Sequence, residues 1–243
     1  MVELQYKLLH WISPGEPDVC TGKAFAGRSK LELLGTPLDV EGKTVIDFGC
    51  GEGHECVELA RRGARKVIGV DIRRELLDRA RDLARQQGVS GTCEFVQYPQ
   101  DKADMMISLD AFEHFEKPAE ILSIMESLVK PEGSIRVSFG PTWYHPLGGH
   151  LFSVFPWAHL LFSEKALIRW RSDFKDDGAT RFHEVAGGLN QMTIRRFEEI
   201  VQKSSLKPKW FECVPIRKLR SLHNSATREF TTAIVRCELV HRH

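Results

Sequence analysis

The sequence of 243 residues predicts a doubly wound α/β fold, in which helices cover both faces of a mostly parallel sheet. Two observations predict it. Between residues 43 and 139, short apolar runs alternate with amphipathic stretches of helical period, and parallel strands need crossover helices to join them. The first apolar run, Thr44–Phe48, ends at a cluster of glycines, which is typical of a strand-to-helix turn that lets a ligand approach the backbone.

Each expected element follows from its own pattern. Apolar runs with the length of strands occupy residues 44–48, 66–70, 92–97, 104–109, 134–139, 209–214 and 230–240. Apolar side chains recur every three or four residues, as on one face of a helix, over 55–62, 75–87, 118–129 and 193–204. A further helix is expected after Ser163, which has the side chain of an N-cap.

The length suits one large domain with an insertion. A short helix and an irregular arm are expected over residues 1–42, followed by the core of alternating strands and helices over 43–139. The alternation stops over residues 140–191, which we interpret as a lid or acceptor-binding insertion. It resumes over residues 192–243, which complete the same core domain.

Composition limits the partners. The 34 basic and 33 acidic residues nearly cancel, so no net field attracts a polyanion and no nucleic acid is expected. The six cysteines are scattered without a CxxC pair, which disfavours a zinc ribbon or a disulfide framework. The N-terminal stretch has neither the pattern of a secretory signal nor the length of a transmembrane segment, so a cytoplasmic protein is expected, with a homodimer left open.

The glycine cluster is the most informative segment. Asp47, Gly49, Gly51 and Gly53 form the pattern D-x-G-x-G-x-G between a strand and a helix. Asp71 ends the next strand, 22 positions after Gly49, the distance at which an acidic side chain binds the hydroxyls of a ribose. Strand, glycine turn, helix, strand and acid in this order predict a cofactor that contains a nucleoside.

Charge distinguishes between the possible cofactors. In the dinucleotide pattern G-x-G-x-x-G, the third glycine would fall on His54. A pyrophosphate at this turn would also be repelled by Asp47 and Glu52. S-adenosylmethionine (SAM) carries an ammonium and a sulfonium instead of phosphates, so acids suit it. SAM is therefore the predicted cofactor, and an NAD-dependent oxidoreductase is the disfavoured alternative.

The sequence resembles the class I SAM-dependent methyltransferases, in particular the type 11-like group that acts mainly on small molecules. The matching segments are VIDFGCGEGHECVELA, VIGVDI, ISLDAFEHF and GSIRVSFGP. The resemblance covers residues 43–139 well and the last 50 residues in outline. It implies a seven-stranded sheet of order 3-2-1-4-5-7-6 with the last strand antiparallel.

The resemblance also implies roles for individual residues. Asp47 and the three glycines would hold the methionine end of SAM, Asp71 the ribose, and Ile72 the adenine ring. Gln100 or Tyr98 would accept the adenine amino group, since the usual acid after the third strand is missing from QYPQDKAD. The cavity near the sulfonium would be lined by Leu109, Asp110, Ala111 and Phe112.

Methyl transfer needs a base only if the nucleophile is protonated, because the leaving group is already activated. His145 and His150 are the preferred base candidates, since WYHPLGGH follows the fifth strand, where acceptors enter in the resembling family. His183 beside Glu184 is a reserve. Asp110 and Glu113 stand where catechol-type enzymes bind magnesium. We favour a packing role for these two acids and expect no metal site.

The stretch HLFSVFPWAHLLFSE at residues 150–164 concentrates aromatic side chains around one proline. Three interpretations stay open: a plug of the core, a lid over the acceptor, and a patch for a membrane surface or a partner. The predicted function is methyl transfer from SAM to a small-molecule acceptor, at a hydroxyl oxygen of a sugar, glycan precursor or secondary metabolite. The alternative is a non-catalytic SAM-binding module that docks a partner through this stretch.

Overall fold

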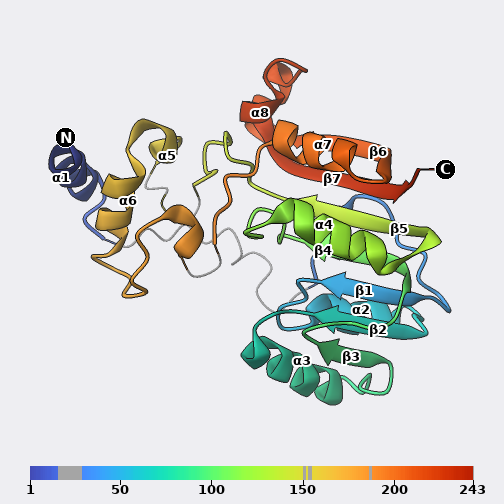
Figure 1. Cartoon of the computed structure of the whole chain (residues 1–243). Helices are drawn as coiled ribbons and strands as arrows, with labels where there is room; N and C mark the ends of the chain where they lie inside the picture. Colours follow the sequence, from blue (N-terminus) through green and yellow to red (C-terminus); the bar gives the residue numbers. More distant parts are fainter. Residues whose placement is uncertain (16–28, 150–151, 153–154, 186–187, 243) are drawn as a thin grey trace.

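A computed structural model describes residues 1–15, 29–149, 152, 155–185 and 188–242 of the chain. Its centre is a seven-stranded sheet of order β3-β2-β1-β4-β5-β7-β6 (Figure 1). Within this described sheet, β7 alone runs in the direction opposite to the other strands. The strands are β1 Thr44–Phe48, β2 Lys66–Val70, β3 Cys93–Val96, β4 Ala103–Leu109, β5 Val129–Phe139, β6 Leu206–Pro215 and β7 Thr232–His241. The predicted fold class and strand order are confirmed.

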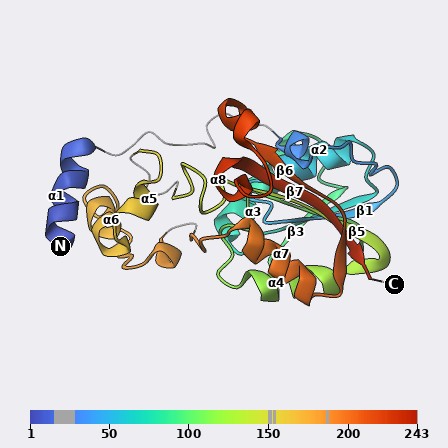
Figure 2. The same cartoon turned by 90° about the horizontal axis from the view of Figure 1, so that it is seen from above.

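Helices cover both faces of the sheet and one of its ends (Figure 2). The α-helices are α1 Val2–Ile12, α2 His54–Arg61, α3 Arg74–Gln86, α4 Pro118–Ser127, α5 Ala158–Leu161, α6 Glu164–Arg171, α7 Ile194–Lys203 and α8 Arg228–Thr231. Shorter 3-10 helices are η2 Leu31–Leu34, η3 Phe182–Glu184 and η4 Arg217–Leu222. Pro118 stands at the start of α4, where its missing N–H costs no hydrogen bond.

The largest boundary error concerns the fifth strand, predicted over residues 134–139. β5 begins at Val129, because the chain pairs with β4 both before and after Pro131 and Gly133. The register shifts between Ala103 and Met105, so the intervening residues of β5 bulge out of the ladder. The predicted helix 118–129 correspondingly ends at Ser127.

Two hydrophobic clusters lie on opposite faces of the sheet. Successive side chains of a strand point to opposite faces, so Val45 joins one cluster with α2 and α3 while Ile46 joins the other with α4 and α7. Both faces are therefore buried, as expected for parallel strands joined by helices. The carboxyl ends of β1, β2 and β4 are held by these cores and meet at one edge.

A third hydrophobic cluster, called here the helical cluster, combines α1, α6 and η3 with the side chain of Phe152. Figures 1 and 2 both show α1 and α6 together, away from the sheet. Trp170 Nε1 donates to the carbonyl of Ser13 at 2.9 Å, and the Arg169 guanidinium lies 4.2 Å from the Tyr6 ring centroid. The first helix and the insertion thus pack together, although they are far apart in sequence.

The aromatic stretch contributes to this helical cluster. Phe152 is fully buried there, against Phe182, so it packs outside both cores of the sheet. Ser163 is the N-cap of α6 as predicted, but its hydroxyl donates to Gln5 Oε1 of α1 at 2.6 Å and makes no capping hydrogen bond.

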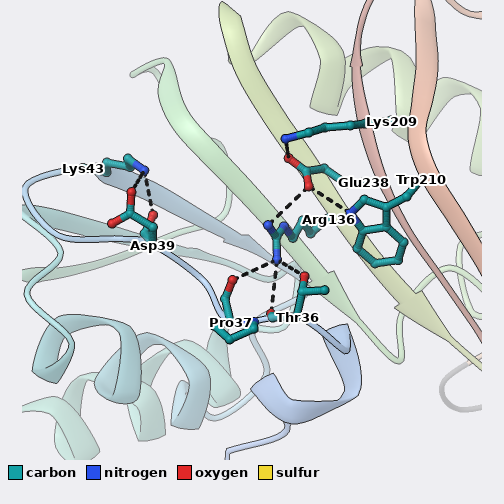
Figure 3. A network of polar contacts seen from close by, with 8 residues as sticks. All are labelled: Thr36, Pro37, Asp39, Lys43, Arg136, Lys209, Trp210 and Glu238. Carbon is teal, nitrogen blue, oxygen red and sulfur yellow. Dashed lines mark hydrogen bonds and ion pairs between the residues drawn. The ribbon is translucent and has the colours of Figure 1, made fainter.

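A buried ion pair fastens the N-terminal arm to the sheet (Figure 3). Arg136 of β5 lies 3.2 Å from the Glu238 carboxylate of β7. The same guanidinium donates to the Thr36 hydroxyl at 2.6 Å and to two carbonyls of the arm. Trp210 and Lys209 also donate to Glu238. Burial alone would raise the pKa of Glu238, but Arg136 and these donors hold it below its usual value.

The cysteines and the helices of the described part of the chain bear on two sequence expectations, on disulfides and on membrane spans. Its five cysteines, at 50, 56, 93, 213 and 237, are free thiols, and Cys20 lies outside the described residues. None of its helices combines the length and the apolarity that crossing a lipid bilayer requires.

Candidate functional site

The three glycines of the turn after β1 have backbone conformations that favour glycine. Their φ angles are +88° at Gly49, +52° at Gly51 and +80° at Gly53. A Cβ at Gly49 would lie 3.0 Å from the Ala111 Cβ, and one at Gly53 would lie 2.8 Å from the Ala80 Cβ. A Cβ at Gly51 would meet no atom within 4 Å. The outer glycines thus permit close packing, while Gly51 faces open space.

Asp47 lies beneath this turn. Its side chain is 2% exposed, and Oδ2 accepts a hydrogen bond from the Cys56 thiol at 3.4 Å. Burial raises the pKa of Asp47 well above its usual value, and the charge of Glu55 raises it further. Asp47 is therefore linked to α2 through Cys56, and its contact with the methionine end of SAM stays a prediction.

Asp71 lies at the end of β2, beside the turn. The Gly51 N–H donates to its Oδ2 at 3.1 Å, and Arg73 donates to both carboxylate oxygens. Burial would raise the pKa of Asp71, but the hydrogen bonds and charge of Arg73 outweigh it and lower the pKa. The carboxylate is ionised at neutral pH and is shared with an arginine that the sequence pattern did not reveal.

Lys30 comes from the N-terminal arm and reaches the same turn. Its ammonium lies 2.8 Å from Asp110 Oδ2 at the end of β4, and its backbone N–H donates to Glu55 Oε1 of α2 at 2.7 Å. Desolvation lowers the pKa of Lys30, but Asp110, Glu55 and Glu113 outweigh this and raise it. A permanent cation thus stands among several acids.

Glu113 is buried three residues after Asp110. One carboxyl oxygen accepts from the Gly140 N–H at 3.3 Å, and the other has no hydrogen-bond partner among the described residues. Burial raises the pKa of Glu113 to about 8, with a smaller contribution from Asp110. Within the described chain, no three His, Cys, Asp or Glu side chains are arranged to hold a metal ion.

The adenine side is open. Ile72 is 78% exposed, so a ring could pack against it, and Gln100 is also exposed. Gln97 contacts the backbone beside the Ile72 side chain: its Nε2 donates to the Ile72 carbonyl at 2.6 Å, and its Oε1 accepts from Arg74. Leu109 and Ala111, which are predicted to line the sulfonium side, are both buried.

The predicted bases occupy different environments. His145 is half-buried, its Nδ1 accepts from the Leu147 N–H at 2.9 Å, and burial lowers its pKa to about 4. His183 is exposed on η3, 4.0 Å from Glu184. His150 lies outside the described residues. The catalytic assignment of these histidines stays a prediction.

Sequence reasoning missed Lys30, Arg73 and Gln97. Lys30 precedes the glycine turn by some twenty residues in an irregular arm, so no periodicity or motif connects them. Arg73 had a usable signal, because a residue two positions after Asp71 is within reach of its carboxylate. Gln97 also had one, because it directly follows β3, the strand next to β2, just as Asp71 directly follows β2.

The residues present fit SAM. Its sulfonium and ammonium suit the acids at this edge, and the open space at Gly51 leaves room for close approach to the backbone. The ionised Asp71 is an acceptor for ribose hydroxyls. A pyrophosphate would instead meet Asp71, Asp110 and Glu55 together.

Comparisons with known proteins agree with a methyltransferase domain. Residues 39–141 match the model of a protein family described as a methyltransferase domain. A ribosomal protein L11 methyltransferase of Vibrio campbellii is 41% identical over 146 residues, which are 53% of this chain and 49% of that relative. Another from Aliivibrio fischeri is 40% identical over 153 residues, 56% of this chain and 51% of the relative. The chain thus spans about half the length of the curated relatives it matches.

Solved structures share the whole fold. One is a chain of the complex between the Haloferax volcanii Trm112 methyltransferase activator and the putative methyltransferase, with a TM-score of 0.59 at 15% identity over 100% of this chain and 98% of that one. Magnesium protoporphyrin IX methyltransferase of Synechocystis with bound S-adenosylhomocysteine has a TM-score of 0.57 at 17% identity, over 99% and 94%. Such identities show the fold alone.

The domain match and the fold confirm the predicted resemblance. Residues 39–141 match a methyltransferase domain, and the described sheet has the strand order that the resemblance to class I SAM-dependent methyltransferases implied, so SAM is the cofactor that this match indicates.

The predicted small-molecule acceptor is wrong. The curated relatives are named for the methylation of a ribosomal protein, so their acceptor is a protein. The error has a physical cause: the motifs that carried the resemblance lie in the sheet and the glycine turn, which bind the methyl donor. Those motifs do not contain the surface that selects an acceptor.

Proposed function

We propose that this chain transfers the methyl group of SAM to a polypeptide acceptor. The observation that carries the proposal is the 41% identity over 146 residues to a ribosomal protein L11 methyltransferase. The acid-lined glycine turn supports the donor, because its charges match the sulfonium and ammonium of SAM.

The residues of the candidate site have different roles. When bound, SAM supplies a methyl group that its sulfonium has already activated, so position and alignment account for most of the rate gain. Asp71 accepts hydrogen bonds from the ribose, and the glycines allow the backbone to approach. Leu109 and Ala111 form an apolar floor that keeps water from the reacting groups.

The exposed face of α1 supports a polypeptide acceptor. Leu4, Leu8 and Trp11 recur at helical spacing on that helix and remain largely exposed, as does Leu161 of α5. Exposed apolar patches are one mark of surfaces that contact other proteins.

The test is incubation of the full chain with tritiated SAM and unmethylated ribosomal proteins, followed by electrophoresis. We expect label in a polypeptide, and tandem mass spectrometry then assigns the methyl group to a nitrogen or to the hydroxyl oxygen predicted from the sequence. Asp71→Ala should lose the label, whereas Asp101→Ala, which changes an exposed acid of the surface pair with Lys66, should keep it. A chain that binds SAM but labels no polypeptide would contradict the proposal.

A further inference from the structure

Lys30 stands at the end of the candidate site that lies opposite Arg73. Arg73 pairs with Asp71, the predicted ribose acid, at 3.1 Å. Lys30 pairs with Asp110, beside the residues that line the sulfonium side. The two cations therefore mark the two ends of the region where SAM is expected to lie.

The acids around Lys30 create a problem for one group of SAM. The methionyl part of SAM carries both an ammonium and a carboxylate. Asp110 and Glu55 attract the ammonium but repel the carboxylate. Like charges a few ångströms apart repel more strongly in a partly buried site than in water. A carboxylate bound here needs a facing cation.

We propose that Lys30 binds the methionyl carboxylate of SAM, an inference that rests on the proposed function. Its ammonium contacts Asp110 at the end of β4, the strand that pairs with β1, and its backbone N–H contacts Glu55 in the first turn of α2, the helix that follows the glycine turn. The side chain is partly exposed, at 28%, so a ligand can reach the ammonium.

The arm holds Lys30 in place. Leu31 and Leu34 of η2 are buried in the core cluster beneath α2, and the arm beyond them is fastened by Arg136 through Thr36 and Pro37. The acids that raise the pKa of Lys30 keep it protonated at neutral pH. The lysine is thus charged and positioned before SAM arrives, which limits the entropy lost on binding.

The test compares SAM with decarboxylated SAM, which keeps the ammonium and the sulfonium and lacks only the carboxylate. Dissociation constants are measured by calorimetry on the full chain and on Lys30→Met. We expect Lys30→Met to bind SAM about tenfold more weakly, as for loss of one charge-assisted hydrogen bond, and to bind decarboxylated SAM no more weakly than the wild type. Lys30→Arg should restore most of the SAM affinity.

Lys66→Met is the matched control, since Lys66 also pairs with two acids but lies on the surface at the start of β2. It should bind both compounds normally. Equal weakening of both compounds by Lys30→Met would show a structural role and overturn the inference, as would unchanged SAM binding. Wild-type protein that binds neither compound would overturn the proposed function and the inference together.

Discussion

Two regions of the molecule are built by different means. One is the edge of the sheet that carries the glycine turn, and the other is the helical cluster away from the sheet. At the turn, Asp47, Asp71 and Asp110 project from the ends of β1, β2 and β4, which neighbouring strands hold in register. In the helical cluster, α1 and α6 are remote in sequence and meet apart from the sheet, through apolar packing, the Arg169–Tyr6 contact and the Trp170–Ser13 hydrogen bond. We therefore expect binding of the methyl donor to depend on the strand ends, and we expect a weakened helical cluster to leave that binding intact.

The largest expected effect tests this independence. Trp170→Ala removes a fully buried ring of the helical cluster and its hydrogen bond to Ser13, which should cost about 3–5 kcal/mol of packing. Hydrogen exchange should rise in α1 and α6, while SAM affinity stays unchanged. Leu161→Ala, a change at an exposed side chain of α5, should alter neither the hydrogen exchange nor the SAM affinity. A parallel loss of SAM affinity in Trp170→Ala would show that the two regions are coupled.

The stability of the fold should depend on pH through Glu113. Glu113 has a pKa of about 8 in the folded chain against an ordinary value of 4.5, so the folded state retains a proton that the unfolded state has lost. Its stabilising contribution is full below pH 4.5 and is lost as pH rises through 8, by about 2 kcal/mol between pH 6.5 and 8. Thermal unfolding across that window should show the decline in wild type and a smaller one in Glu113→Gln.

The range from pH 6.5 to 8 lies above the range in which His145 has the opposite effect on stability. Its pKa falls from 6.5 to about 4 on folding, so its contribution is present above pH 6.5 and is lost as pH falls. Identical slopes for wild type and Glu113→Gln between pH 6.5 and 8 would mean that Glu113 is ionised in the fold, contrary to the account of its burial.

The next effect sharpens the ribose assignment. Asp71→Ala removes the only carboxylate that the sequence pattern assigns to the ribose, and SAM affinity should fall by at least tenfold, about 1.4 kcal/mol. Calorimetry of the folded variant measures this, with Asp101→Ala as the control at an exposed acid. Unchanged affinity would refute the assignment of Asp71.

The smallest expected effects on stability concern two helix N-caps. Thr193 accepts a hydrogen bond from the Arg196 N–H at the start of α7, beside the sheet. Thr193→Ala should therefore cost about 1 kcal/mol. Ser163→Ala should cost less, because the Ser163 hydroxyl bonds to Gln5 and leaves the N-terminal N–H groups of α6 uncapped. Chemical denaturation of both variants checks the order, and a larger loss at Ser163 would reverse it.

The sequence was most informative where structure is local. Gly49 and Asp71 are linked by one strand–helix–strand unit, so their separation predicted their meeting, and the alternating elements predicted the sheet. Lys30 reaches the turn only through the packing of Leu31 and Leu34, which no short spacing encodes. The contact of α1 with α6 was hidden for the same reason, since about 150 residues separate them.

The acid-lined turn is expected to bind SAM. Calorimetric titration of the full chain with SAM, repeated in the presence of excess NAD, tests this directly. We expect saturable binding at one site per chain that NAD does not displace. Absence of saturable binding, or displacement of SAM by NAD, would contradict it.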